Sequence, residues 1–179
     1  IACHYGVGQQ HKVVDISFIG ELGHSSLTDR HLAVPMDGSS DGVPTTYVPA
    51  RNLIFLSLAT AYAETLGAEA IYIGVNSVDF SGYPDCRPQF IFSFNETANL
   101  ATQMTTSGQK KLYVKAPLIS LSKAEIIQWG TALGVPYELT TSCYLGEELA
   151  CGRCDSCRLR LKGFQECGLT DPIPYKEML

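Results

Sequence analysis

Four cysteines in the C-terminal part of the chain constrain its fold more than any other feature. Cys143, Cys151, Cys154 and Cys157 are separated by seven, two and two residues. Two short spacings in series let neighbouring sulfurs converge on one ion, and four thiolates suit a closed, structural zinc site. An iron–sulfur cluster uses similar spacing, and a redox-active cysteine pair is a further alternative. We therefore expect a metal-binding segment over residues 143–179.

The composition is that of a globular protein, with 45% hydrophobic and 17% charged residues in 179. The net charge of −5 provides no basic field for direct nucleic-acid binding, and no polybasic run for a membrane surface. No stretch reaches the roughly 18 apolar residues of a membrane helix. The seven cysteines are odd in number and clustered, which favours a reducing, cytoplasmic compartment over a disulfide scaffold.

Strand and helix patterns alternate along the chain, which favours an α/β fold with a parallel sheet. The expected strands are residues 12–18, 70–75 and 112–117, and the expected helices are 51–66, 89–104 and 123–133. Residues 1–5 also resemble a strand, but only six residues separate them from 12–18. A parallel crossover needs a dozen or more. The two segments therefore form a hairpin, or a crossover helix is missing.

Arg51, Asn52 and Lys123 lie at predicted helix starts, where backbone N–H groups and the helix dipole favour an anion. They are candidate phosphate ligands, with surface ion pairing or simple solvent exposure as the alternative. Arg153, Arg158, Arg160 and Lys162 lie in or beside the cysteine cluster and can offset its negative charge. Those four residues fit either a solvated helix face or a phosphate site.

The segment 74–87 follows the predicted central strand, at the sheet edge where ligands of open α/β sheets bind. It presents a dense group of hydrogen-bonding side chains suited to a polar heterocycle: Asn76, Asp79, Ser81, Tyr83, Asp85 and Arg87. The alternative is an ordinary turn stabilised by Asp and Gly.

Together, TYVPARNLIFLSLA, IGVNSVDFSGYPDCRPQFI, APLISLSKAEII and SCYLGEELACGRCDSCRLRLKGF closely resemble the 7-cyano-7-deazaguanine synthase family. That family belongs to the ATP-pyrophosphatase superfamily. The resemblance implies an adenine-nucleotide α-hydrolase-like (Rossmann-like) domain, here an incomplete one over residues 1–142, with the zinc-binding segment 143–179 packed on it. It also implies a cytoplasmic homodimer.

The implied reaction converts 7-carboxy-7-deazaguanine and ammonia to the nitrile in queuosine biosynthesis, with ATP and Mg²⁺ as substrate and adenylated intermediates. By resemblance, Cys143, Cys151, Cys154 and Cys157 are the zinc ligands. Arg51, Asn52 and Lys123 contact the nucleotide, and Asp79, Tyr83, Asp85 and Arg87 contact the deazaguanine. No general base can be named.

The chain departs from the family at its start. The family begins with a strand and a glycine-rich SGGxDS phosphate loop, which this sequence lacks, and it opens without Met. We therefore expect a fragment or a chain with a gap. The alternatives are another ligase of the superfamily such as a tRNA thiolase, a non-catalytic zinc-stabilised assembly module, and a zinc-ribbon nucleic-acid binder.

Overall fold

The computed structural model describes residues 1–36, 38, 42–76, 82–108 and 110–176. The chain divides into two compact units. The central unit is Pro49–Ser122, and the terminal unit combines Ile1–Val48 with Lys123–Leu179.

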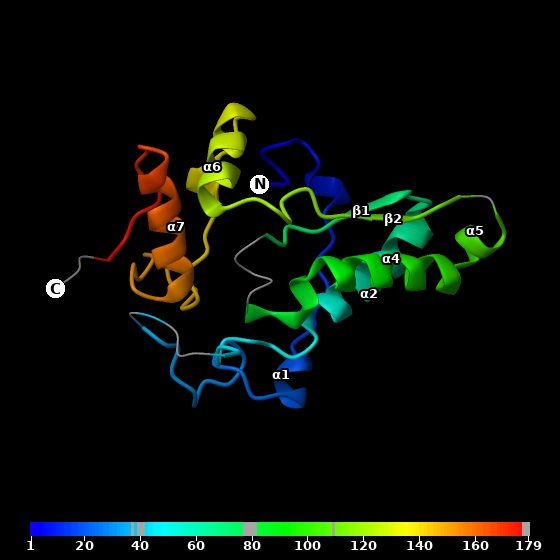
Figure 1. Ribbon diagram of the computed structural model, residues 1–179, viewed down its shortest axis with the longest axis horizontal. Helices are drawn as coiled ribbons and strands as arrows, with labels where there is room; N and C mark the ends of the chain where they lie inside the picture. Colours follow the sequence, from blue (N-terminus) through cyan, green and yellow to red (C-terminus); the bar gives the residue numbers. More distant parts are fainter. Residues whose placement is uncertain (37, 39–41, 77–81, 109, 177–179) are drawn as a thin grey trace. The chain divides into compact units, whose positions relative to one another are not determined.

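The central unit is an α/β layer with a parallel sheet, as predicted. β1 (Ala70–Tyr72) pairs in parallel with β2 (Tyr113–Lys115), so that Ile71 lies opposite Val114. α2 (Arg51–Leu66) and α4 (Pro88–Ala101) pack against the two strands (Figure 1). α4 lies in the crossover that parallel pairing requires. The short elements η2 (Pro84–Cys86) and α5 (Gln103–Thr106) precede and follow it.

One hydrophobic core joins the helices and strands of the central unit. Its buried members come from both helices, from β1, from η2 and from residues close to the two strands: Leu56, Ala63, Ile71, Val75, Cys86, Ile91, Phe94, Ala98 and Leu112. These side chains recur at helical spacing on α2 and α4, which is why the sequence predicted both helices correctly.

Two asparagines one turn apart on α4 pair with the backbone of β2 and its flank. Asn99 accepts from the Leu112 N–H at 3.0 Å and donates to the Leu112 carbonyl at 2.7 Å, while Asn95 accepts from the Val114 N–H at 2.8 Å. Strand edges expose unpaired backbone groups, and here side chains of the packed helix satisfy them.

The predicted strand at residues 12–18 is wrong, and so is the strand-like reading of residues 1–5. Residues 12–16 are irregular, residues 2–6 form a turn, and neither segment joins a ladder in the described chain. Val13 is 83% exposed, and the Asp15 carboxyl accepts the Ser17 N–H at 2.9 Å. A β-branched run becomes a strand only where a partner strand and a core meet it. Here a local side-chain bond takes the place of the ladder.

The terminal unit is built around two neighbouring helices. α6 (Lys123–Ala132) packs along α7 (Asp155–Glu166), and Figure 1 shows the two side by side. The shorter elements of the unit are η1 (Gly8–Gln10), α1 (Ile19–Leu22) and η3 (Tyr137–Leu139). Among the helices in the described ranges, none has both the length and the apolar character that a bilayer crossing needs.

Gly163 allows α6 and α7 to approach closely. A Cβ atom at Gly163 would lie 2.8 Å from Ile127 Cδ1 and 3.3 Å from the Lys123 backbone carbon. Also on α6, the Tyr137 hydroxyl occupies the space that a side chain at Gly130 would need. That hydroxyl donates to the Ile126 carbonyl at 3.1 Å.

We expect Gly163→Ala to destabilise the protein by about 1–3 kcal/mol, because the added methyl group overpacks a backbone contact. The free-energy cost of overpacking exceeds the roughly 1 kcal/mol by which the higher helix propensity of alanine over glycine stabilises the variant. Chemical denaturation followed by circular dichroism measures it. Gln165→Ala, at an exposed position of the same helix, is the control. Equal stability of the two variants would contradict the close approach.

Candidate functional site

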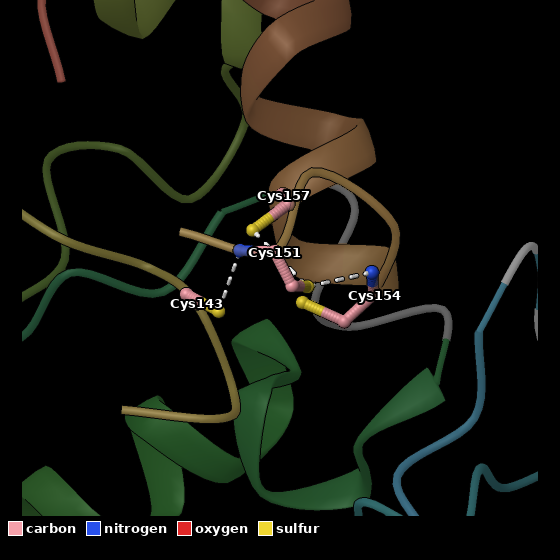
Figure 2. A group of neighbouring side chains, drawn as sticks. All are labelled: Cys143, Cys151, Cys154 and Cys157. Carbon is pink, nitrogen blue, oxygen red and sulfur yellow. Dashed lines mark hydrogen bonds between the residues drawn. The ribbon is translucent and has the colours of Figure 1, made fainter. Parts of the chain in front are cut away.

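The four predicted metal ligands converge in the terminal unit. The sulfurs of Cys143, Cys151, Cys154 and Cys157 all lie within 4.8 Å of one another (Figure 2). A tetrahedral ion with metal–sulfur bonds of about 2.3 Å holds its sulfurs about 3.8 Å apart. The Sγ atoms of Cys151 and Cys157 are 3.9 Å apart. The donor set therefore fits a four-coordinate metal ion.

Local backbone geometry brings the last three cysteines together. Gly152 has φ of +71°, a left-handed conformation that lets the chain turn sharply after Cys151. Cys154 is the N-cap of α7, and Cys157 lies in the first turn of that helix. Negative charge at a helix N-terminus is favourable, so this placement suits two thiolates.

Backbone N–H groups point at the sulfurs. Cys151 Sγ accepts from the N–H groups of Cys154 at 3.3 Å and Arg153 at 3.4 Å, and Cys143 Sγ accepts from the Cys151 N–H at 3.4 Å. Figure 2 draws two of these bonds. Hydrogen bonds of this kind stabilise the thiolate form.

The cysteine pKa values follow from burial and these bonds. Burial raises the pKa of Cys151, but the backbone N–H donors outweigh it and bring the pKa down to about 7. Burial raises the pKa of both Cys154 and Cys157. Metal ions bind the deprotonated thiolate, so metal binding here would release protons.

Apolar side chains from distant parts of the chain cover the cluster. Cys154 and Cys157 are 0% and 1% exposed. Five partly buried residues pack against the cluster besides Cys143: Val34, Met36, Tyr144, Ile173 and Tyr175. Met36 also forms an antiparallel bridge with Cys154. The site is therefore closed by protein, as structural metal sites are.

Three of the four basic residues beside the cluster have acidic partners within the terminal unit. Arg158 pairs with Asp155 at 3.8 Å, and Lys162 pairs with Glu166 at 3.7 Å. Arg160 makes a two-pronged pair with the buried Asp171, at 2.6 Å from Nε and 2.8 Å from Nη2. Arg160 thus belongs to a buried network. The sequence had suggested a solvated helix face or a phosphate site for this residue, and neither interpretation included such a network.

In the central unit, four of the predicted ligand residues lie together at the start of α2. The Asn52 N–H donates to Asp85 Oδ2 at 2.8 Å, and the Asn52 side chain donates to the Asp85 carbonyl at 3.3 Å and to Cys86 Sγ at 3.1 Å. Arg51 lies over the Tyr83 ring, 6.0 Å from its centroid. Asp85 therefore caps the helix from the η2 loop, and both Asn52 and Asp85 are buried.

The remaining predicted contacts lie at element starts or outside the described residues. Arg87 is exposed and precedes α4 as its N-cap residue, and Lys123 is the first residue of α6. Asp79 lies outside the described residues, as does Ser81. No observation tests the ligand roles of these side chains, which stay predictions.

Sequence reasoning missed the residues that surround Arg160. Asp171 and Tyr175 follow a turn in a proline-containing segment with no helical periodicity, so no pattern marked them. The weak signal in the sequence was the alternation of Ile173 and Tyr175 with Pro172, Pro174 and Lys176. In the structure, residues 171, 173 and 175 are the partly buried ones.

The fold and the cluster define an α/β protein with a four-cysteine cluster that could hold a metal ion. Its sequence matches the family described as queuosine biosynthesis protein QueC over residues 1–168. A 7-cyano-7-deazaguanine synthase of Oceanobacillus iheyensis is 53% identical over 98% of this chain and 77% of its own length. Synthases of the same name from Aromatoleum aromaticum and Dechloromonas aromatica are 55% and 56% identical, over 94% and 93% of this chain and 74% of their own lengths. The chain belongs to the QueC family, which confirms the resemblance seen in the sequence.

We expect Cys157→Ser to remove most of the bound metal and to lower the stability of the protein, because a buried hydroxyl replaces one of four thiolate ligands. Elemental analysis of the purified protein gives the metal content, and thermal unfolding gives the stability. Cys3→Ser is the control, since Cys3 is exposed and outside the cluster. Undiminished metal content in Cys157→Ser would contradict the four-thiolate site.

We expect Asp85→Ala to lower the stability by about 1–2 kcal/mol, because it removes the cap of α2 and leaves the buried Asn52 N–H unpaired. Glu96→Ala, at an exposed position of α4, is the matched control in the same unit. Urea denaturation measures both variants. A variant at position 85 as stable as the control would mean that Asp85 does not cap the helix.

Proposed function

We propose that this protein is an ATP-dependent ligase that converts 7-carboxy-7-deazaguanine and ammonia into 7-cyano-7-deazaguanine. The observation that carries the proposal is the identity of 53–56% to synthases of that name, over 93–98% of the chain. Identity this high over nearly the whole chain goes with the same reaction.

The chemistry explains the need for ATP. A carboxylate is a poor electrophile, so transfer of AMP to its oxygen, with release of pyrophosphate, creates a leaving group. Ammonia then adds to the carbonyl carbon and AMP leaves, which gives the amide. A second ATP transfers AMP to the amide oxygen, and loss of that AMP with two protons leaves the nitrile. Positioning and stabilisation of phosphate charge supply most of such catalysis.

Two cations at helix starts are the proposed phosphate contacts. Arg51 begins α2 and Lys123 begins α6, where the backbone N–H groups also favour anions. Tyr83 and Arg87 are the proposed deazaguanine contacts, together with Asp79. In this proposal, Asn52 and Asp85 contribute to nucleotide and substrate binding by fixing the α2 terminus that carries Arg51.

Zinc is the proposed occupant of the cysteine cluster, in a structural role. The sulfur spacing supports this choice, since one ion bound by all four thiolates needs them close together. A four-iron cluster spreads its cysteine sulfurs farther apart, because each binds a different iron. The four thiolates Cys143, Cys151, Cys154 and Cys157 would hold the zinc, which would cross-link the chain segments around it.

The remaining parts of the proposal rest on the resemblance. They are Mg²⁺ bound with ATP, a homodimer in the cytoplasm, and a nucleotide-binding domain over residues 1–142 followed by the zinc-binding segment 143–179. The SGGxDS phosphate loop does not occur in the sequence. The chain covers 74–77% of the relatives compared above, so the activity is best assayed on the complete gene product.

The test combines product analysis with two charge-removing variants. We expect nitrile formation, with two AMP per product, to require ATP, ammonia and the carboxylic acid. Arg51→Ala and Lys123→Ala are each expected to lower kcat/KM by roughly 10–100-fold, since each removes a charged hydrogen bond to phosphate. Lys111→Ala, an exposed lysine of the central unit, is the control.

Absence of nitrile in a metal-loaded, folded sample would contradict the synthase and favour a non-catalytic assembly module. Titration of Mg²⁺–ATP into the same sample separates these cases further, because an assembly module has no need to bind ATP. If Arg51→Ala and Lys123→Ala are as active as the Lys111→Ala control, the proposed reaction stands, but Arg51 and Lys123 do not contact the phosphates.

A further inference from the structure

A charged network lies beneath the last segment of the described chain. Asp171 has a side chain only 1% exposed, and that of Arg160 is 11% exposed. The Arg160 guanidinium donates to both carboxylate oxygens of Asp171, to Thr140 Oγ1 at 2.7 Å and to the Tyr137 carbonyl at 3.2 Å. One arginine therefore joins α7, the η3 turn and the C-terminal segment, residues 171–176.

Asp171 has further donors from the C-terminal segment itself. The Tyr175 hydroxyl donates to Asp171 Oδ2 at 2.7 Å, and the Ile173 N–H donates to Oδ1 at 3.3 Å. Burial raises the pKa of Asp171, but the bonds from Arg160 and Tyr175 outweigh it and hold the pKa below its ordinary value. A buried carboxylate with four bonds to donors of its own unit is fully satisfied.

The same segment covers the cysteine cluster. Ile173 and Tyr175 pack against the buried cysteines, and a Cβ atom at Gly152 would lie 3.6 Å from the Tyr175 ring. The backbone is paired as well, since the Ala150 N–H donates to the Pro174 carbonyl at 3.1 Å and the Lys176 N–H donates to the Ala150 carbonyl at 2.9 Å. Ala150 directly precedes the ligand Cys151. Lys176 also pairs with Glu147.

These contacts connect Asp171 to access to the cluster. Cys151, Cys154 and Cys157 are at most 7% exposed, so a chelator reaches their sulfurs only after part of the cover opens. The backbone pairing with Ala150, the Lys176–Glu147 pair, the packing of Ile173 and Tyr175 and the Asp171 network hold the C-terminal segment in place. Because Arg160 holds Asp171 in place, residues 172–176 can lift off the cluster only if the bond between Tyr175 and Asp171 breaks.

We propose that Asp171, fixed by Arg160 and bonded to Tyr175, is a positioning residue that keeps the C-terminal segment closed over the four-cysteine cluster and thereby slows metal exchange. The proposal rests on the metal site proposed above. Asp171 acts on the rate at which the ion leaves, while the four thiolates set how many ions bind.

The experiment follows transfer of zinc from the loaded, complete protein to an excess of a chelating dye, 4-(2-pyridylazo)resorcinol, at neutral pH. Tyr175→Phe removes one hydroxyl and leaves the ring over the cluster. We expect it to release zinc about tenfold faster than the wild type, since loss of a hydrogen bond to a charged group raises the open population by that order. Asp171→Asn should release zinc at least as fast as Tyr175→Phe.

The control is Tyr72→Phe, which removes a hydroxyl from an exposed tyrosine of the central unit. Zinc content before the dye is added should be one per chain in all these proteins, and circular dichroism should show the same fold. If Asp171 contributed only to global stability, Tyr175→Phe would lower the melting temperature. Its zinc release would then be faster only by as much as its global unfolding is faster.

Three outcomes decide the matter. Faster release in Tyr175→Phe, with unchanged zinc content and fold, supports the proposal. Release at the rate of the Tyr72→Phe control in both Tyr175→Phe and Asp171→Asn overturns the proposal. It would mean that the cover opens elsewhere, for example at the Met36–Cys154 bridge. A wild-type protein without bound metal overturns the metal site itself, and the proposal with it.

Discussion

The convergence of four sulfurs within 4.8 Å is the constraint on which the terminal unit depends. Thiolates that are buried and close together repel one another and lose hydration, so they need an ion, N–H donors and a helix N-terminus to be stable. The chain provides the donors through the turn at Gly152 and provides the helix through α7. Segments far apart in sequence, around Met36 and Tyr175, then exclude water from the cluster. A bound metal would therefore contribute folding free energy to much of this unit.

The Arg160–Asp171 pair is another buried group of charges in the terminal unit. Like the four cysteines, it is stable only where partners satisfy the buried charges. Burying an ion pair costs desolvation energy, which is offset only when every donor and acceptor is satisfied. Here Thr140, Tyr137 and Tyr175 complete the bonds that the pair itself leaves open. The pair fixes where α7, η3 and the C-terminal segment meet, so its main contribution is geometric. This explains why a basic residue close to the cysteine cluster does not act simply as a counter-charge.

In the central unit, polar side chains determine how the helices begin and how the sheet edge is satisfied. Asp85 caps α2 from a loop 33 positions away in sequence, and Asn95 and Asn99 bond to the backbone in and next to β2. The capped start of α2 presents Arg51 beside Tyr83, which is the arrangement that the proposed function uses. Asn52 and Asp85 were both predicted as ligand contacts, and they are bonded to each other instead of standing free. Their ligand roles stay predictions, and their structural role is a finding.

The sequence alone determined the features that depend on spacing and local pattern. It was sufficient for the grouping of the four cysteines, the helices α2, α4 and α6, the parallel sheet of the central unit, and the family. The cysteine cluster and the helices follow from short spacings and periodicity, the parallel sheet from the alternation of strands and helices, and the family from its motifs. Only the tertiary structure decided that Val13 and its neighbours form no strand, that Asp85 caps α2, and that Asp171 and Tyr175 close over the cysteines. These outcomes depend on whether a partner arrives from a distant segment, and no local pattern records that partner, because burial and hydrogen bonding are satisfied only in the folded chain.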